Sequence, residues 1–191
     1  WKDVLGIYPV NPRWGVQSAP IPYLGYAEAI EFSNADATIL HPATVEPVYE
    51  MGIPIEIRHL ARYKENGLKT VIGPDIEANP NIKGIACVPR VACVNAEVRY
   101  IQDAALELSD LLQELNEAGI RICSFETTNT QWRFVFPQHE VSRGVQIIKK
   151  RCAVVDYEYF AAMLSFIGCR DIDYLQEKLA LYQDVTKSQL Y

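Results

Sequence analysis

The sequence lacks several features that would each point to a particular class of protein. None of its apolar runs approaches the roughly 20 residues that a membrane-spanning helix needs, and it does not open with a charged segment followed by an apolar one. Its five cysteines are odd in number and include no C-x-x-C pair, which argues against a zinc site or a disulfide framework. We therefore expect reduced thiols, a cytoplasmic protein, no membrane contact and no metal-ligating residues.

Positive charge is also scarce. The chain has 18 Lys and Arg residues against 24 Asp and Glu residues, for a formal charge of -6. Nucleic-acid-binding proteins usually gather basic residues on one face, and the single basic run here, Lys149-Lys150-Arg151, fits a solvated helix end. No nucleic-acid partner is expected. The length of 191 residues and the 49% hydrophobic composition allow one or two compact domains.

Residues 1 to 74 alternate strand-like and helix-like segments, which predicts an α/β domain. The apolar spacing and the positions of proline and glycine predict two helices, Tyr26 to Ala35 and Pro42 to Gly52, and two strands, Ile53 to Ile57 and Thr70 to Ile72. Turn-forming residues at Gly73-Pro74-Asp75 and Asn79-Pro80-Asn81 predict a domain boundary.

Residues 81 to 156 follow the order β-α-β-β-α-β. The first strand position holds two predicted segments, 82–88 and 91–100, around a turn at Pro89-Arg90. The other predicted strands are 120–125, 132–136 and 152–155, and the predicted helices are 104–118 and 141–151. This is the ferredoxin-like plan of small ligand-binding ACT domains, with helices on one face of an antiparallel sheet. Residues 157 to 191 start again with a strand at 160–168 and a helix, and we interpret them as a partial second unit.

Two motifs near the start carry the most specific signal. The first is W-K-D-V-L-G-I-Y-P-V-N-P-R at Trp1 to Arg13, and the second is L-H-P-A-T at Leu40 to Thr44. In sequence, order and spacing they resemble the nucleotide-binding end of aspartate kinases. The corresponding motifs of that family are W-T/K-D-V-x-G-I/V-Y/L-T-T/A-D-P-R and G-A-K-V-L-H-P-A/R. Weaker likenesses at Ile82 to Ala86 and Gly119 to Thr128 extend the resemblance to the regulatory ACT region of this family.

The resemblance implies a fold and a function. Residues 1–74 would be the C-terminal part of an amino-acid-kinase-like nucleotide-binding domain, residues 81–156 an ACT domain and residues 157–191 part of a second one. Aspartate kinases use ATP and Mg²⁺ to phosphorylate the β-carboxylate of L-aspartate, giving 4-phospho-L-aspartate for lysine, threonine and methionine synthesis. Lysine or threonine regulates them through paired ACT units, so a homodimer through this region is expected.

The family's opening K-F-G-G-T stretch and its aspartate-binding residues do not occur in this sequence. We therefore expect the chain to be part of a longer protein and to be inactive as a kinase by itself, and no catalytic residue is assigned. His41, before Pro42, is interpreted as a helix-entry residue rather than a base, because no Ser or Cys nucleophile stands in a recognisable setting.

Phosphoryl transfer needs a cradle for the phosphates, a metal ion and positive charge where negative charge develops. By the resemblance, Lys2, Asp3, Tyr8 and Arg13 lie at the nucleotide. Thr38 and Ile39 occupy the positions of the lysine and valine in G-A-K-V-L-H-P, and Asn11 stands where the family has the aspartate of T-D-P-R. Because Thr38 carries no positive charge, ATP should bind more weakly unless another cation enters the site.

The resemblance also indicates an effector site at the loop entering the first ACT helix. Its candidate residues are Gln102, Asp103 and Ala104, together with Thr127, Thr128 and Asn129. The last three fit a simple polar turn equally well. Cys123 replaces the strand aspartate of the family, so a lysine effector would lack its expected carboxylate partner unless Asp103 supplies one.

Two alternatives stay open. Thr38 and Asn11 are consistent with a non-catalytic, amino-acid-sensing regulatory module that keeps a degenerate kinase remnant. Another member of the amino-acid kinase superfamily, acting on a different carboxylate or phosphate, is the third reading. The ACT-like second half disfavours it, because most of those relatives lack such a region.

Overall fold

The computed structural model describes residues 1–35, 40–62, 64, 68–76, 82–98, 104–128, 130–169 and 171–186. The chain divides into two compact units, one of Trp1–Ala86 with Ser165–Tyr191 and one of Cys87–Leu164. Helices and strands alternate, so the predicted mixed α/β class is confirmed. Among the described helices, none has the length and apolar character to cross a membrane. The domain limits at 74, 81 and 156 stay a prediction.

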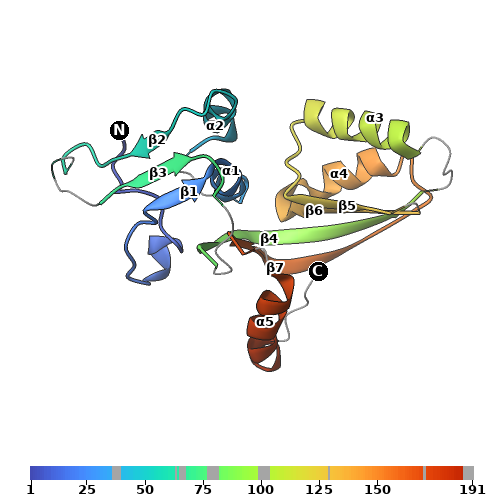
Figure 1. The fold of residues 1–191 in the computed structure, drawn as a ribbon. Helices are drawn as coiled ribbons and strands as arrows, with labels where there is room; N and C mark the ends of the chain where they lie inside the picture. Colours follow the sequence, from blue (N-terminus) through green and yellow to red (C-terminus); the bar gives the residue numbers. More distant parts are fainter. Residues whose placement is uncertain are drawn as a thin grey trace. The chain divides into compact units, whose positions relative to one another are not determined.

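The first unit contains a three-stranded sheet in the order β1-β3-β2. Its strands are β1 (Tyr23–Gly25), β2 (Ile55–Ile57) and β3 (Thr70–Gly73), with β1 parallel and β2 antiparallel to β3. Helices α1 (Tyr26–Asn34) and α2 (Pro42–Tyr49) pack with this sheet around a core that includes Leu24, Phe32, Val45 and Ile72. Figure 1 shows both helices beside the small sheet.

Both predicted helices of this unit form, with small differences at their ends. The Nδ1 atom of His41 accepts a hydrogen bond from the Ala43 amide at 3.2 Å, so His41 caps α2 as predicted. The helix ends at Tyr49 rather than Gly52, which has φ of +64° in the following turn. Strand β1 was missed, because three residues after a proline give no alternating pattern.

The second unit contains a four-stranded sheet in the order β5-β6-β4-β7. The strands are β4 (Gly84–Glu97), β5 (Ser124–Thr127), β6 (Gln131–Pro137) and β7 (Val154–Ile167), and the helices are α3 (Ala104–Glu117) and α4 (Val141–Ile148). Both helices cover one face of the sheet (Figure 1), which confirms the ferredoxin-like plan. Trp132, Phe134 and Phe136 of β6 pack there against Leu111 and Leu115 of α3.

The predicted turn at Pro89-Arg90 is wrong, because β4 runs unbroken from Gly84 to Glu97. Its pairing with β6 begins only at Val91, opposite Pro137. At Pro89 the edge toward β6 is therefore free, and a residue without an amide hydrogen is tolerated there. Arg90, the next residue, has a left-handed backbone conformation, with φ of +51°.

The predicted separate strands at 152–155 and 160–168 are also wrong, because one strand, β7, runs from Val154 to Ile167. Strand β5 starts at Ser124 rather than Ile120, since Ile120 is buried against α3 and its amide bonds to the Leu115 carbonyl. Helix α4 ends at Ile148 instead of Arg151, whereas Gly119 follows α3 with φ of +66°, as expected of a C-terminal cap. The remaining elements are η1 (Pro12–Trp14), η2 (Gln138–Glu140) and α5 (Ile172–Thr186).

Candidate functional site

The loop from Lys2 to Arg13 carries the four described nucleotide candidates, and its start is fixed by main-chain bonds. The Lys2 amide donates to the Arg58 carbonyl at 3.0 Å, and the Leu60 amide donates to the Lys2 carbonyl at 2.9 Å. Lys2 thus forms a parallel bridge with His59, just after β2. These bonds use only the Lys2 main chain, so its exposed ammonium group extends from a fixed point of the loop.

A buried threonine fixes the middle of the loop. The Ile7 amide donates to Thr70 Oγ1 at 2.8 Å, and the Ile7 carbonyl accepts from the Ile21 amide at 2.7 Å. Thr70 is a fully buried polar residue, and a side chain at Gly6 would collide with its hydroxyl. The glycine therefore allows the loop to approach β3 closely enough for the hydroxyl to satisfy a buried amide.

The end of the loop is a short 3₁₀ turn whose cap is Asn11. Its Oδ1 accepts from the Arg13 amide at 3.0 Å, and the turn closes at Gly15, with φ of +77°. Asn11 stands where aspartate kinases have an aspartate, and its side chain still provides an oxygen that accepts a hydrogen bond. The turn holds the main chain of Arg13, while its side chain is exposed.

The four described candidates thus lie on one anchored loop. Lys2, Asp3 and Arg13 are exposed and Tyr8 is half-buried. Lys2 and Arg13 are exposed cations at the two ends of this loop. Thr38 and Ile39 lie outside the described residues. Among the residues that the structure describes, no cluster of His, Cys, Asp or Glu could hold a metal ion.

The N-terminus of α1 was not singled out from the sequence, although it is the nearest regular helix start to this loop along the chain. Its amide groups already have partners within the protein. Asp75 Oδ1 accepts from the Ala27 amide at 3.1 Å, and Glu28 Oε2 accepts from the Gly25 amide at 2.8 Å. Because two carboxylates already occupy this helix end, a phosphate group would have to compete with them there.

In the second unit, the described effector candidates lie at one end of the sheet. Ala104 begins α3 and Thr127 ends β5, and Figure 1 shows the start of α3 and the β5–β6 turn at the same end. The Val98 amide, just after β4, donates to the Thr130 carbonyl in this turn at 3.0 Å. Gln102, Asp103 and Asn129 lie outside the described residues.

Thr128 has a structural role at this end. Its hydroxyl oxygen accepts from the Gln131 amide at 3.0 Å, and the hydroxyl lies 3.2 Å from the Gln131 carbonyl, to which it donates. These bonds close the β5–β6 turn, which is the polar-turn reading of Thr127 to Asn129. Thr127, at the end of β5, is exposed and can be reached by a ligand.

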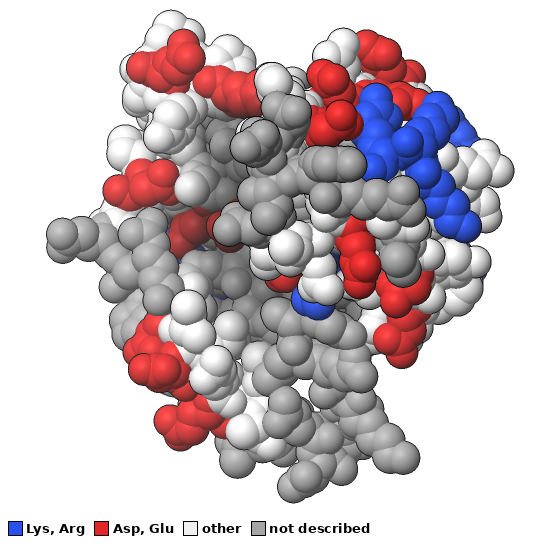
Figure 2. Space-filling view, turned by 90° about the vertical axis from the view of Figure 1, so that its right-hand side faces the viewer, with Lys and Arg blue, Asp and Glu red and all other residues white. Residues whose placement is uncertain are grey.

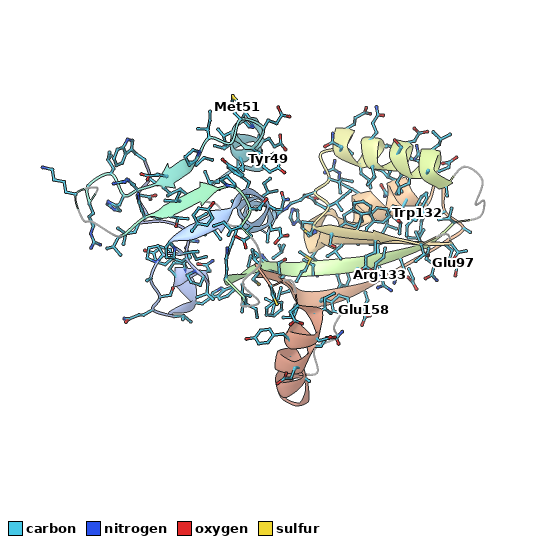
Figure 3. All side chains as sticks on the ribbon, in the orientation of Figure 1. Tyr49, Met51, Glu97, Trp132, Arg133 and Glu158 are labelled. Carbon is cyan, nitrogen blue, oxygen red and sulfur yellow. The ribbon has the colours of Figure 1, made fainter. Side chains whose placement is uncertain are left out.

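The face of this sheet opposite the helices is polar. Arg133 lies there with Glu158 of β7 (Figure 3) and donates to Asn95 Oδ1 at 3.1 Å and Glu126 Oε2 at 3.3 Å. Cys93 is buried on this face, and burial raises the pKa of its thiol, partly offset by the Arg133 charge. Cys93 is therefore a neutral core thiol near pH 7 rather than a nucleophile.

Figure 2 shows Lys and Arg side chains lying directly beside Asp and Glu side chains. Two ion pairs of this kind are made by Lys150 and Arg151, just after α4, which each bond to Glu114 of α3 at 2.5 Å. These two hydrogen bonds lower the pKa of the Glu114 carboxyl group. Two cations of the only basic run in the sequence thus stabilise the contact between α3 and the end of α4.

The chain is similar in sequence to aspartokinases, although no protein-family model matches it. It is 27% identical over 157 residues to bifunctional aspartokinase/homoserine dehydrogenase 2, chloroplastic, of Arabidopsis thaliana, covering 79% of this chain and 17% of that protein. It is also 27% identical over 173 residues to the aspartokinase of Geobacillus stearothermophilus, covering 88% of this chain and 42% of that protein. The chain thus spans less than half the length of either relative.

Solved aspartate kinases share the fold. The enzyme of Clostridium acetobutylicum superimposes with a TM-score of 0.72 at 20% identity, over 96% of this chain and 45% of that one. Aspartokinase III of E. coli, in complex with aspartate and ADP, gives a TM-score of 0.69 at 18% identity, over 96% and 43%. The resemblance seen in the motifs is therefore confirmed: the curated homologues are aspartokinases and bifunctional aspartokinase/homoserine dehydrogenases.

Proposed function

We propose that this chain contributes the nucleotide-binding loop and the regulatory ACT region of an aspartate kinase. Such an enzyme transfers the γ-phosphoryl group of ATP to the β-carboxylate of L-aspartate. The observation that carries the proposal is the anchored loop, which presents Lys2, Asp3, Tyr8 and Arg13 in the order of the aspartokinase motif. The sequence similarity to aspartokinases over most of the chain also supports it.

The loop suits the charge requirements of a nucleotide site. Lys2 and Arg13 are exposed cations on a main chain held by several hydrogen bonds, so they can meet phosphate oxygens without ordering the loop first. Tyr8 is half-buried between them along the chain and offers a ring surface for the nucleoside. Mg²⁺ would arrive with ATP and neutralise phosphate charge during transfer.

The second unit supplies the proposed regulation. An effector amino acid would bind near the start of α3 and the end of β5, at Ala104 and Thr127 among the described candidates. E. coli aspartokinase III, which shares the fold, has been solved in complex with lysine and aspartate. We propose that lysine or threonine binds this chain, that two copies associate through this unit, and that the protein is cytoplasmic.

Calorimetric titration of the full chain with Mg-ATP tests the nucleotide site. Arg13→Gln should raise the Kd for Mg-ATP about tenfold, since one charge-assisted contact to phosphate is lost. Lys150→Gln removes one cation from the second unit, where it pairs with Glu114, and should leave the Kd unchanged. Equal affinities of wild type and Arg13→Gln would contradict this nucleotide site.

A second candidate function is a non-catalytic module that senses an amino acid. The observation that favours it is Thr38, which stands where aspartate kinases have a lysine. Saturable binding of lysine or threonine without any binding of Mg-ATP would support this function. If Thr38→Lys then restores Mg-ATP binding, the missing cation at this position explains why the site does not bind the nucleotide. If Thr38→Lys does not restore binding, further differences from the aspartate kinase motif contribute.

A further inference from the structure

Strand β4 begins in direct contact with the loop that carries the nucleotide candidates. The Ile85 amide donates to the Pro9 carbonyl at 2.7 Å, and Pro9 directly follows Tyr8. At Gly84, an added Cβ would lie 2.6 Å from the Pro9 oxygen and 2.5 Å from Phe32 Cζ. Only a glycine allows the strand to approach the loop this closely.

The end of strand β7 lies beside this contact. The Lys83 amide donates to the Ile167 carbonyl at 2.8 Å, and both residues belong to the first unit. Ala86 and Ile167 are both buried, in the same core cluster as Ile7 of the loop. We call Lys83–Ala86 and Ile167–Gly168 together the strand root.

Within the first unit, an ion pair also joins the strand root to helix α1. Lys83 Nζ lies 2.6 Å from Glu28 Oε2, and the two side chains are only 26% and 18% exposed. The same Glu28 oxygen accepts from the Gly25 amide at the start of α1. Because the pair is partly buried, it is screened less by salt than a surface ion pair.

The nature of these contacts determines how a displacement would spread. Pro9 contributes a main-chain oxygen both to the hydrogen bond with Ile85 and to the close approach at Gly84. A rotation of a side chain cannot absorb a displacement of such an oxygen. A movement of the strand root toward the loop is therefore expected to shift the main chain at Pro9, and with it the adjacent Tyr8.

We propose that the strand root positions the loop from Lys2 to Arg13 for nucleotide binding, with Gly84 and Ile85 as positioning residues that touch no nucleotide themselves. This proposal rests on the proposed function of the loop. It gives the start of β4 and the end of β7, which both belong to the first unit, a role in the nucleotide site of that unit. Neither Gly84 nor Ile85 belongs to the motif by which the loop was recognised.

The test measures amide hydrogen exchange of the full chain, with and without Gly84→Ala, followed by titration with Mg-ATP. In the variant, amides from Ile7 to Gly15 should exchange about tenfold faster, and the Kd for Mg-ATP should rise about tenfold. Gly119→Ala is the matched control, because it strains a glycine with φ of +66° at the end of α3. It should leave the exchange of the loop and the Kd unchanged.

A second variant keeps the test decisive if Gly84→Ala does not fold. Gly84→Ala combined with Phe32→Leu shortens the ring that a new Cβ would strike, while the contact with the Pro9 oxygen remains. This double variant should fold and still show faster exchange in the loop. Unchanged exchange of the loop in the folded variant overturns the proposal, whether or not the wild type binds Mg-ATP. Failure of the wild type to bind Mg-ATP instead counts against the proposed function.

Discussion

The aromatic core of the second unit and the candidate loop of the first unit are stabilised by different kinds of interaction. In the second unit, three aromatic residues of one strand, Trp132, Phe134 and Phe136, are buried under two helices, and the last two rings stack with centroids 5.8 Å apart. In the first unit, the candidate loop depends on single contacts, including a buried hydroxyl at Thr70 and a close approach at Gly6. The difference teaches that substitutions in the aromatic core should unfold the second unit as a whole, whereas substitutions at the loop contacts should loosen this loop locally.

The largest expected effect comes from the aromatic core of the second unit. Phe134→Ala should lower the free energy of unfolding by about 3–5 kcal/mol, because a fully buried ring is lost and a cavity remains. Urea denaturation followed by circular dichroism measures the change. Phe125→Ala removes the neighbouring ring, which is 48% exposed, and serves as the control. If both substitutions cost the same free energy, the second unit does not depend on this buried core.

An intermediate effect is expected at Thr70. Thr70→Val keeps the shape of the side chain but leaves the Ile7 amide without its acceptor, at an expected cost of about 1–3 kcal/mol. Hydrogen exchange should accelerate in the loop around Ile7 and not in the second unit. Thr127→Val, at an exposed position, is the control. Uniformly faster exchange throughout the chain would contradict the local role of Thr70.

The smallest effect is a pH dependence at Glu114. Bonds to Lys150 and Arg151 lower the pKa of this carboxyl group in the folded chain, so its stabilising contribution is present above its unfolded pKa and is lost as the pH falls through the folded value. Glu114→Gln should therefore reduce the urea midpoint at pH 7, and its difference from wild type should shrink toward pH 3. Glu46→Gln, on an exposed position of α2, is the control. A difference that grows toward pH 3 would have the wrong sign.

Much of the second unit could be predicted from its sequence, because its helices and strands follow regular apolar patterns. Leu111 and Leu115 of α3 are buried as their spacing predicts. Pro89 misled the strand prediction, since the free edge that tolerates it depends on where β6 ends, at Pro137 opposite Val91. The first unit was harder to predict in detail. Asp75 and Lys83 meet the start of α1 from 48 and 55 residues away in sequence, at Ala27 and Glu28, and such contacts leave no periodic pattern.

The central claim is that nucleotide binds the loop of the first unit while effector binds the second unit. Hydrogen exchange of the full chain with Mg-ATP, and separately with lysine or threonine, tests it most directly. The account predicts that Mg-ATP slows exchange between Lys2 and Arg13, and that an effector slows exchange near Ala104 and Thr127 instead. Protection by Mg-ATP confined to the second unit, or no protection of the loop at saturating Mg-ATP, would contradict it.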